Sequence, residues 1–206
     1  MKDVLLILAG YVLGSMPWGY WLPRALKGVN IRKVGSGNTG AANVWRMLGF
    51  KIGLSVALLD LAKGLAAALL GVWLGGELVG LFAGIAAMIG HWRPLFIRFG
   101  RGGKIVATTG GVALALVPLA TLAAGGVWVG AFLATRYTSV ASMLSAATLP
   151  LFAVLFGASG PVIGFAAGAA VAIFVLHRAN IARLLSRTEN RFELGRRATT
   201  RARGGA

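Results

Sequence analysis

The sequence contains no cysteine and few acidic residues. Its 206 residues include five Asp or Glu and two His. Without cysteine there is no disulfide, no thiolate metal site and no thiol nucleophile. Only one acid, Asp60, lies inside a long apolar run. A catalytic pair of carboxylates or an acid-rich metal centre is therefore not expected.

Apolar residues and basic charge are abundant instead. Hydrophobic residues make up 57% of the chain, Gly occurs 31 times, and 21 Lys and Arg give a net charge of +16. Such a composition is not that of a soluble globule. The charges cluster in gaps between apolar runs, which favours loops facing anionic lipid or phosphorylated substrates over a nucleic-acid surface. The sequence therefore predicts a membrane protein surrounded by lipid, with no nucleic-acid partner.

The apolar runs are long enough to cross a bilayer, which takes about 20 residues. The stretch 105–135 is interrupted by Pro118 and by Gly125-Gly126, and it suits two short or tilted helices better than one. We predict an all-α, polytopic bundle of seven spans, with five or six as the alternative. One transmembrane domain would occupy residues 1–190, followed by a basic, disordered tail over 191–206. The other predicted spans lie near 4–22, 52–74, 78–97, 139–157 and 160–177.

The basic groups also predict how the chain is oriented. In the seven-span arrangement all of them share one side, which the positive-inside rule makes cytoplasmic. The N-terminus would then lie outside and the C-terminus inside. Small residues four apart are expected to allow close helix contact, although they are also common in any packed bundle. These pairs are Gly80/Gly84, Gly126/Gly130 and Gly164/Gly168.

A first polar motif, Gly35-Ser36-Gly37-Asn38-Thr39-Gly40, lies between the first two predicted spans. We expect Ser36 and Asn38 to cap a helix that begins near Ala41 and carries Asn43 and Arg46. Exposed amides, a helix N-terminus and a guanidinium would together form an anion cradle. A turn followed by an N-cap explains the pattern equally well.

A second motif, Gly102-Gly103-Lys104, leads into an apolar run. Amides, a cation and a positive helix end would meet there, although the spacing is not that of a Walker sequence. Lys104 is alternatively a positive-inside loop charge. His91 lies at a membrane depth where titratable groups are rare, which favours a functional role.

The remaining candidates lie on the second span and near the chain's end. His177, Asn180 and Arg183 are three apart and would share a helical face. Asp60 and Lys63 are predicted to form an intramembrane pair, with a structural role preferred over a catalytic one. Ser142, taken alone, is an ordinary packing residue.

Together these motifs resemble the bacterial membrane family of acyl-phosphate:glycerol-3-phosphate acyltransferases, the PlsY type. The resemblance runs from about Leu13 to Glu189, and the order and spacing of the motifs carry it. Three positions depart from the family pattern. Ala42 replaces the usual Thr, Ile105 replaces the Gly that follows Gly-Gly-Lys, and Arg187 replaces the Gly of Gly-x-Glu. The stretch between Phe99 and Lys104 is also one residue longer than usual.

The resemblance implies a function. It is acyl transfer from acyl phosphate to the 1-hydroxyl of sn-glycerol 3-phosphate, giving lysophosphatidate and phosphate, at the cytoplasmic face of the bacterial inner membrane. An activated donor needs no cofactor, metal or covalent nucleophile, and no obligate protein partner is evident. The catalytic residues implied are Ser36, Arg46, Lys104, Ser142, His177 and Asn180. Phosphate-binding residues would be Gly37, Asn38, His91, Gly102 and Gly103, with Asn43, Asp60 and Lys63 in support.

Two other classes of function fit part of the sequence. A transporter or channel for a phosphorylated solute would use the intramembrane Asp60, Lys63 and His91. The polar residues gather toward one membrane face, however, and do not line a path through the midplane. A structural membrane protein with a basic tail leaves the Gly-Gly-Lys and His-x-x-Asn patterns unexplained.

Overall fold

The computed structural model describes residues 1–192, and that part of the chain contains helices and no strand. Residues 193–206, most of the predicted tail, lie outside the described part. Two short 3-10 turns, η1 (Ile31–Lys33) and η2 (Leu95–Ile97), lie in loops. The α-helices are α1 (Lys2–Gly14), α2 (Trp18–Lys27), α3 (Ala41–Leu48), α4 (Phe50–Gly75), α5 (Glu77–Trp92), α6 (Val106–Leu116), α7 (Pro118–Thr135), α8 (Thr138–Leu155), α9 (Gly160–Leu176) and α10 (Arg178–Leu185).

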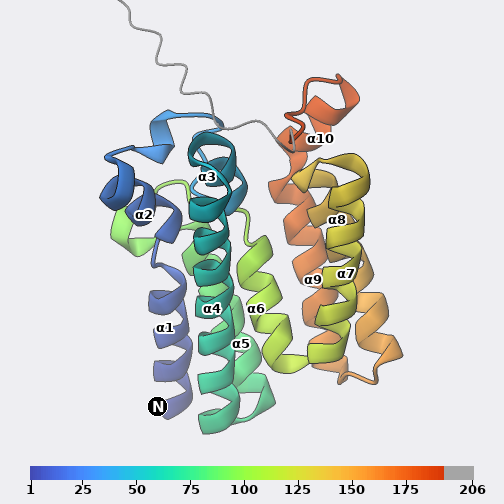
Figure 1. Cartoon of the computed structure of the whole chain (residues 1–206). Helices are drawn as coiled ribbons and strands as arrows, with labels where there is room; N and C mark the ends of the chain where they lie inside the picture. Colours follow the sequence, from blue (N-terminus) through green and yellow to red (C-terminus); the bar gives the residue numbers. More distant parts are fainter. Residues whose placement is uncertain (193–206) are drawn as a thin grey trace, which may run out of the picture.

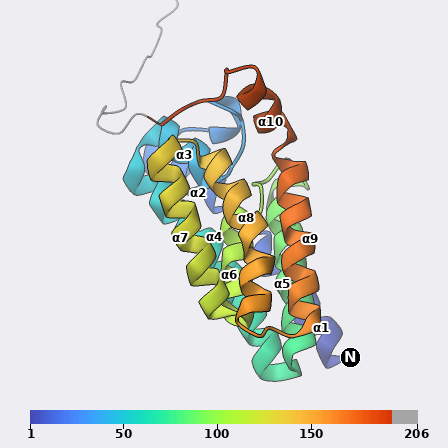
Figure 2. The same cartoon turned by 90° about the vertical axis from the view of Figure 1, so that its right-hand side faces the viewer.

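The long helices stand side by side in one bundle (Figure 1). The N-terminus lies at one end of the bundle, and the short helices α2, α3 and α10 gather at the other. Helices α7, α8 and α9 form a layer on one side, as the turned view shows (Figure 2). Loops from distant parts of the sequence thus meet at the end that carries α3 and α10.

Within residues 1–192, five segments are long and apolar enough to cross a membrane, and the pair α9 and α10 makes a sixth if its 57° bend is counted within one span. The remaining long helix, α6, has 11 residues. At ~1.5 Å per residue it is about 17 Å long, too short to cross alone. The predicted multi-pass, all-helical membrane fold is confirmed.

Two predicted segments contain a break. The stretch 105–135 divides at Val117 and Pro118 into α6 and α7, as expected, because proline lacks the amide that would continue the helix. The stretch 4–22, predicted as one span, is interrupted between Gly14 and Trp18. Pro17 precedes the new helix there and favours its start.

Glycine brings four helices into backbone contact. A side chain at Gly14 of α1 would collide with Ala87 of α5, and one at Gly64 of α4 would collide with Thr108 of α6. Gly80 and Gly84 likewise lie against α4 and α6, as predicted. The same prediction is wrong for the other two glycine pairs, because a Cβ added at any of them meets no atom within 4 Å. They are Gly126/Gly130 and Gly164/Gly168.

The main apolar core lies among α4 to α9 and contains many small side chains, such as Ala113, Ala120 and Ala153. A second cluster, around Ile31, Val44 and Val56, fixes the loop between α2 and α3 onto α4. Large apolar side chains point outward along the bundle, for example Leu133 and Leu151, which are more than 60% exposed. Such a surface suits lipid contact.

Candidate functional site

Asn43 organises the loop before α3. Its Oδ1 accepts a 3.0 Å hydrogen bond from the amide of Ser36, and its Nδ2 donates to the carbonyls of Val34 and Asn38, at 3.2 and 2.9 Å. The side chain is 2% exposed. Three bonds from one buried amide hold the loop closed, so Asn43 sets the positions of Ser36 and Asn38.

The predicted cap of α3 is wrong in detail. The helix begins at Ala41 as expected, but Gly40 is the N-cap residue and no side chain caps the helix. Asn38 Oδ1 instead accepts a 2.7 Å bond from the amide of Gly40, which makes a local Asx turn. The turn therefore competes with capping for the same side chain.

The loop before α6 rests on the end of α5. The amides of Gly102 and Gly103 donate to the carbonyls of Trp92 and His91, at 3.1 and 3.2 Å. A side chain at Gly103 would collide with the His91 imidazole. These glycines fix the position of Lys104 on the loop. Their part in phosphate binding stays a prediction.

His91 belongs to a buried ionic cluster beneath that loop. Asp60 Oδ1 lies 2.8 Å from Lys63 Nζ and 3.4 Å from His91 Nδ1, and Lys63 also donates to the carbonyl of Met16, at 2.9 Å. The predicted Asp60–Lys63 pair is confirmed. Because the cluster joins α4, α5 and the break between α1 and α2, it supports the scaffold under Lys104.

Lys104 meets residues of the last helix. Its ammonium donates to Asn180 Oδ1, and Asn180 Nδ2 donates to Glu189 Oε1 at 2.6 Å. Ser139 also donates to that oxygen, at 2.9 Å, while Arg183 Nε donates to Glu189 Oε2 at 2.7 Å. The carboxylate thus fixes the Asn180 amide so that its oxygen faces Lys104.

Three other predicted residues make contacts outside this network. His177 Nδ1 lies 2.8 Å from the carbonyl of Ile173, at the bend between α9 and α10. Ser142 Oγ accepts a 3.2 Å bond from Trp128 Nε1. Arg46 lies over the ring of Phe192 at 5.3 Å, and that ring packs against Trp45 and Phe132.

The charge of the site is predominantly positive. Burial lowers the pKa of Lys104 to about 8; Glu189 opposes this effect, while Arg183, Arg46 and Arg101 add to it. Burial alone would raise the pKa of Glu189, but hydrogen bonds from Asn180, Arg183 and Ser139 outweigh it and the pKa is lowered. Several cations around one ionised carboxylate favour an anionic ligand.

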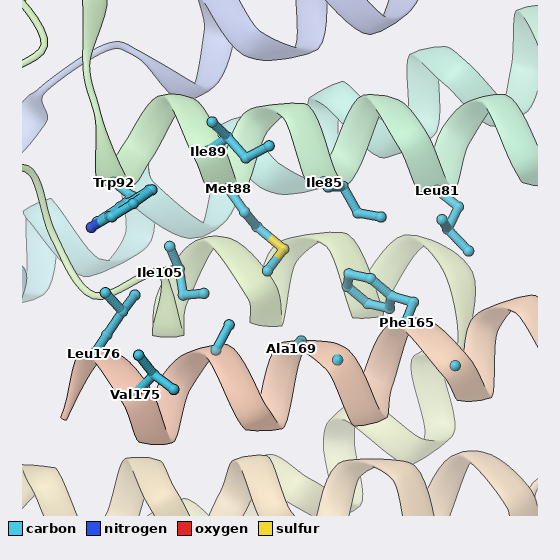
Figure 3. A pocket seen from close by; sticks show the side chains of 13 residues that line it. Leu81, Ile85, Met88, Ile89, Trp92, Ile105, Phe165, Ala169, Val175 and Leu176 are labelled. Atoms are coloured by element: carbon cyan, nitrogen blue, oxygen red, sulfur yellow. The ribbon is translucent and has the colours of Figure 1, made fainter. Parts of the chain in front are cut away.

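An apolar groove of about 580 Å³ runs between α5 and α9. Figure 3 shows Trp92, Ile105 and Leu176 at one end and Leu81 and Phe165 toward the other. The rest of the lining comes from Ile85, Met88, Ile89, Gly164, Gly168, Ala169, Ala172 and Val175. Within residues 1–192, no three His, Cys, Asp or Glu side chains gather to hold a metal ion.

Two residues of the network were missed by sequence reasoning. Glu189 and Ser139 are 9% and 2% exposed, and they bond to each other across 50 positions. A signal for Glu189 was present, since the resembled motif ends in Glu. Nothing in the sequence singled out Ser139, whose role depends on the fold.

Comparisons with known proteins agree on one family. A family model described as glycerol-3-phosphate acyltransferase matches residues 4–187. A protein of that name from Desulforudis audaxviator is 44% identical over 189 residues, which cover 92% of this chain and 95% of the relative. One from Halalkalibacterium halodurans is 44% identical over 203 residues, covering 95% and 97%.

Two solved structures are also similar. They are crystal structures of PlsY (YgiH), an integral membrane glycerol 3-phosphate acyltransferase, in glycerol 3-phosphate and lysophosphatidic acid forms. The TM-scores are 0.88 and 0.87 at 41% and 40% identity, and each match covers 94% of this chain and 96% of the other.

Proposed function

This chain belongs to the glycerol-3-phosphate acyltransferase family, and on that premise we propose that it transfers a fatty acyl group from acyl phosphate to the 1-hydroxyl of sn-glycerol 3-phosphate. The products are lysophosphatidate and inorganic phosphate. The reaction is the first acylation of phospholipid synthesis, and it uses neither coenzyme A nor a metal.

One juxtaposition supports the proposal above all. The cationic network around Lys104 adjoins the end of the apolar groove, since Ile105 of the groove directly follows Lys104. An acyl phosphate has the same two parts, an anionic head and an apolar chain. Its phosphate would lie near Lys104 and its chain in the groove.

The chemistry needs positioning more than a nucleophile from the protein. The hydroxyl oxygen attacks the carbonyl carbon of the mixed anhydride, a new ester C–O bond forms, and the bond from the carbonyl carbon to the phosphate oxygen breaks. Lys104 and Arg46 would stabilise the leaving phosphate and the anionic intermediate. Ser36, Ser142, His177 and Asn180 would hold the substrates' phosphates.

The hydroxyl proton needs an acceptor. Phosphate and histidine have comparable pKa values, so either group suits the task. His91 is 6% exposed and lies beneath Gly103, while His177 Nδ1 is engaged with Ile173. We therefore assign the proton to the phosphate group of glycerol 3-phosphate itself. A Gln variant of either histidine that binds both substrates normally but loses about a thousandfold in the chemical step would instead identify the base.

We also propose seven membrane crossings, with the N-terminus outside and the site facing the cytoplasm. The short α6 would make the fourth crossing, with local thinning of the bilayer taking up its length mismatch. Basic loops on the side of α3 and α10 support this orientation. A C-terminal reporter fusion should be active only in the cytoplasm. Activity on the outer side would overturn the topology.

Product formation tests the function directly. Purified protein in detergent is incubated with glycerol 3-phosphate and either palmitoyl phosphate or palmitoyl-coenzyme A. We expect lysophosphatidate with palmitoyl phosphate only. Detergent leaves no compartment, so a transporter gives no product. Product from palmitoyl-coenzyme A alone would refute the proposed donor.

A further inference from the structure

The polar site and the apolar groove meet through three pairs of sequence neighbours. Trp92, Ile105 and Leu176 lie at one end of the groove (Figure 3). Each is next to a polar residue in the sequence. Trp92 follows His91, Ile105 follows Lys104, and Leu176 precedes His177. This end is therefore where a ligand passing from the polar site into the groove has to enter.

Ile105 holds an unusual backbone conformation at that entrance. Its φ is +59°, and it is the one β-branched residue among the non-glycine residues of positive φ in the described chain. A β-branched side chain strongly disfavours this region, whereas glycine adopts it freely. Ile105 is nonetheless 4% exposed and packs into the main core. The fold holds a large side chain at a position whose backbone suits glycine.

Further from the entrance, the groove has open space along α9. Gly164 and Gly168 of α9 face it, and a Cβ at either would meet no atom within 4 Å. From Trp92 to Leu81 the wall follows α5 over eleven residue-to-residue steps, or about 17 Å at ~1.5 Å per residue. That is about half of the ~30 Å apolar thickness of a bilayer. The α9 wall thus leaves room for an acyl chain along the groove, while Ile105 adds bulk at the entrance.

We propose that Ile105 is a specificity-determining residue that selects acyl chains unbranched next to the carbonyl. The inference rests on the proposed function, because it takes the acyl phosphate head to lie at Lys104. The carbons nearest the carbonyl then pass Ile105 on their way between Trp92 and Leu176. A straight chain passes beside the Ile105 side chain, and a methyl branch at the second carbon collides with it.

The test compares two acyl phosphates of equal length, one straight and one methyl-branched at the second carbon. The ratio of their kcat/KM values is measured for the purified wild-type protein and for Ile105→Ala. Wild type should favour the straight donor. Ile105→Ala should lower that preference by about tenfold, the smaller end of the discrimination that one methylene in an apolar pocket provides.

Two further variants separate selectivity from folding. Ile105→Val keeps the β-branch, removes one methyl group and should shift the ratio part of the way. Arg187→Gly also replaces a residue of positive φ, but Arg187 is exposed and does not line the groove. Its ratio should equal that of wild type.

The outcomes distinguish this inference from the function on which it rests. If the wild-type protein transfers no acyl group from either acyl phosphate, the proposed function fails. If it uses the straight donor but Ile105→Ala and Ile105→Val keep the wild-type ratio, the function stands and the role of Ile105 is refuted. An equal shift in Arg187→Gly would refute it too, because the effect would then follow from backbone relaxation.

Discussion

Glycine plays opposite roles in two groups of helices, the first being α1 with α4 to α6 and the second being α7 with α9. In α1, α4, α5 and α6, glycines such as Gly14 and Gly64 lie against neighbouring backbones, where a methyl group would collide. In α7 and α9, Gly126, Gly130 and Gly168 have open space where a Cβ would lie. Glycine content alone therefore does not reveal helix contact. The first group is a close-packed scaffold, and the second presents an open apolar face.

The site forms where the two groups meet. The scaffold contributes Lys104, on a loop held by the end of α5, and the segment that follows α9 contributes Asn180 and Glu189. Close packing suits the first contribution, because a cation that stabilises a transition state has to be positioned before the reaction.

Removing the Lys104 ammonium should have the largest effect. Lys104→Ala is expected to reduce transfer about a thousandfold, the upper end of what losing one charge-stabilising donor costs. The protein should stay folded, because the Lys104 side chain bonds to Asn180 and is not part of the apolar core. Arg at this position should rescue only partly, since its planar fork presents donors differently from an ammonium. Steady-state kinetics with a thermal unfolding control measures both.

Retention of most activity by Lys104→Ala would mean that the longer loop has moved phosphate binding elsewhere. Arg101, three residues earlier on the same loop, would then be the next candidate. Arg101→Ala in the Lys104→Ala background would check that possibility.

Displacing Lys104 should have the next largest effect on the rate of transfer. Gly103→Ala places a methyl group against the His91 ring and displaces the loop, whereas Gly130→Ala meets no neighbour. A displacement of about 1 Å at a catalytic group costs about a hundredfold in rate. We expect that loss in Gly103→Ala and less than about a twofold change in Gly130→Ala. Equal effects of the two substitutions would contradict the division into packed and open glycines.

The sequence predicts the scaffold better than the network built on it. Spans, loop positions and the Asp60–Lys63 pair follow from hydropathy and from spacings of a few residues. The bonds from Lys104 to Asn180 and from Ser139 to Glu189 join residues 76 and 50 positions apart, and no local pattern specifies them. The failed cap of α3 has a different cause, because Asn38 accepts the Gly40 amide in an Asx turn, which the local sequence pattern does not distinguish from an N-cap.

Two departures from the family pattern share a backbone feature. Ile105 and Arg187 replace the usual glycines, and both adopt positive φ, at +59° and +58°. The pattern thus records a backbone requirement that this chain meets with non-glycine residues. The sequence shows the substitutions, but only the backbone angles show what they have in common.

Glu189 should act on rate through Lys104, as a positioning residue. Burial lowers the pKa of Lys104 to about 8, and the Glu189 charge opposes that effect. Lys104 is charged below this pKa, so kcat/KM should be highest near neutrality and fall as the pH rises through about 8. Glu189→Gln should lower kcat/KM about tenfold at pH 7, the cost of one hydrogen bond to a charged group. It should also move the fall in kcat/KM to lower pH.

The pH profile separates that role from simple structural damage. A structural loss would lower kcat/KM equally at every pH and leave the fall near pH 8. Lys104→Arg is the control for the titrating group, because a guanidinium stays charged throughout this range. If Lys104→Arg keeps the same alkaline fall, a group other than Lys104 causes it.

The smallest expected effect is on stability, at Arg187 just after the last helix. Arg187 follows α10 with φ +58° and an exposed side chain, while its amide donates to the carbonyl of Leu184 at 3.1 Å. The left-handed region costs an L-residue roughly 1–2 kcal/mol, and glycine gives back roughly 0.5–1 kcal/mol through its greater freedom in the unfolded chain. Arg187→Gly should therefore stabilise the protein by about 0.5–1 kcal/mol, seen as a higher unfolding midpoint in detergent. Ser186→Gly, one residue earlier at φ −83°, relieves no strain and should lower the midpoint. A lower midpoint for Arg187→Gly as well would show that its side chain stabilises the turn leading to Glu189 by more than the backbone strain costs.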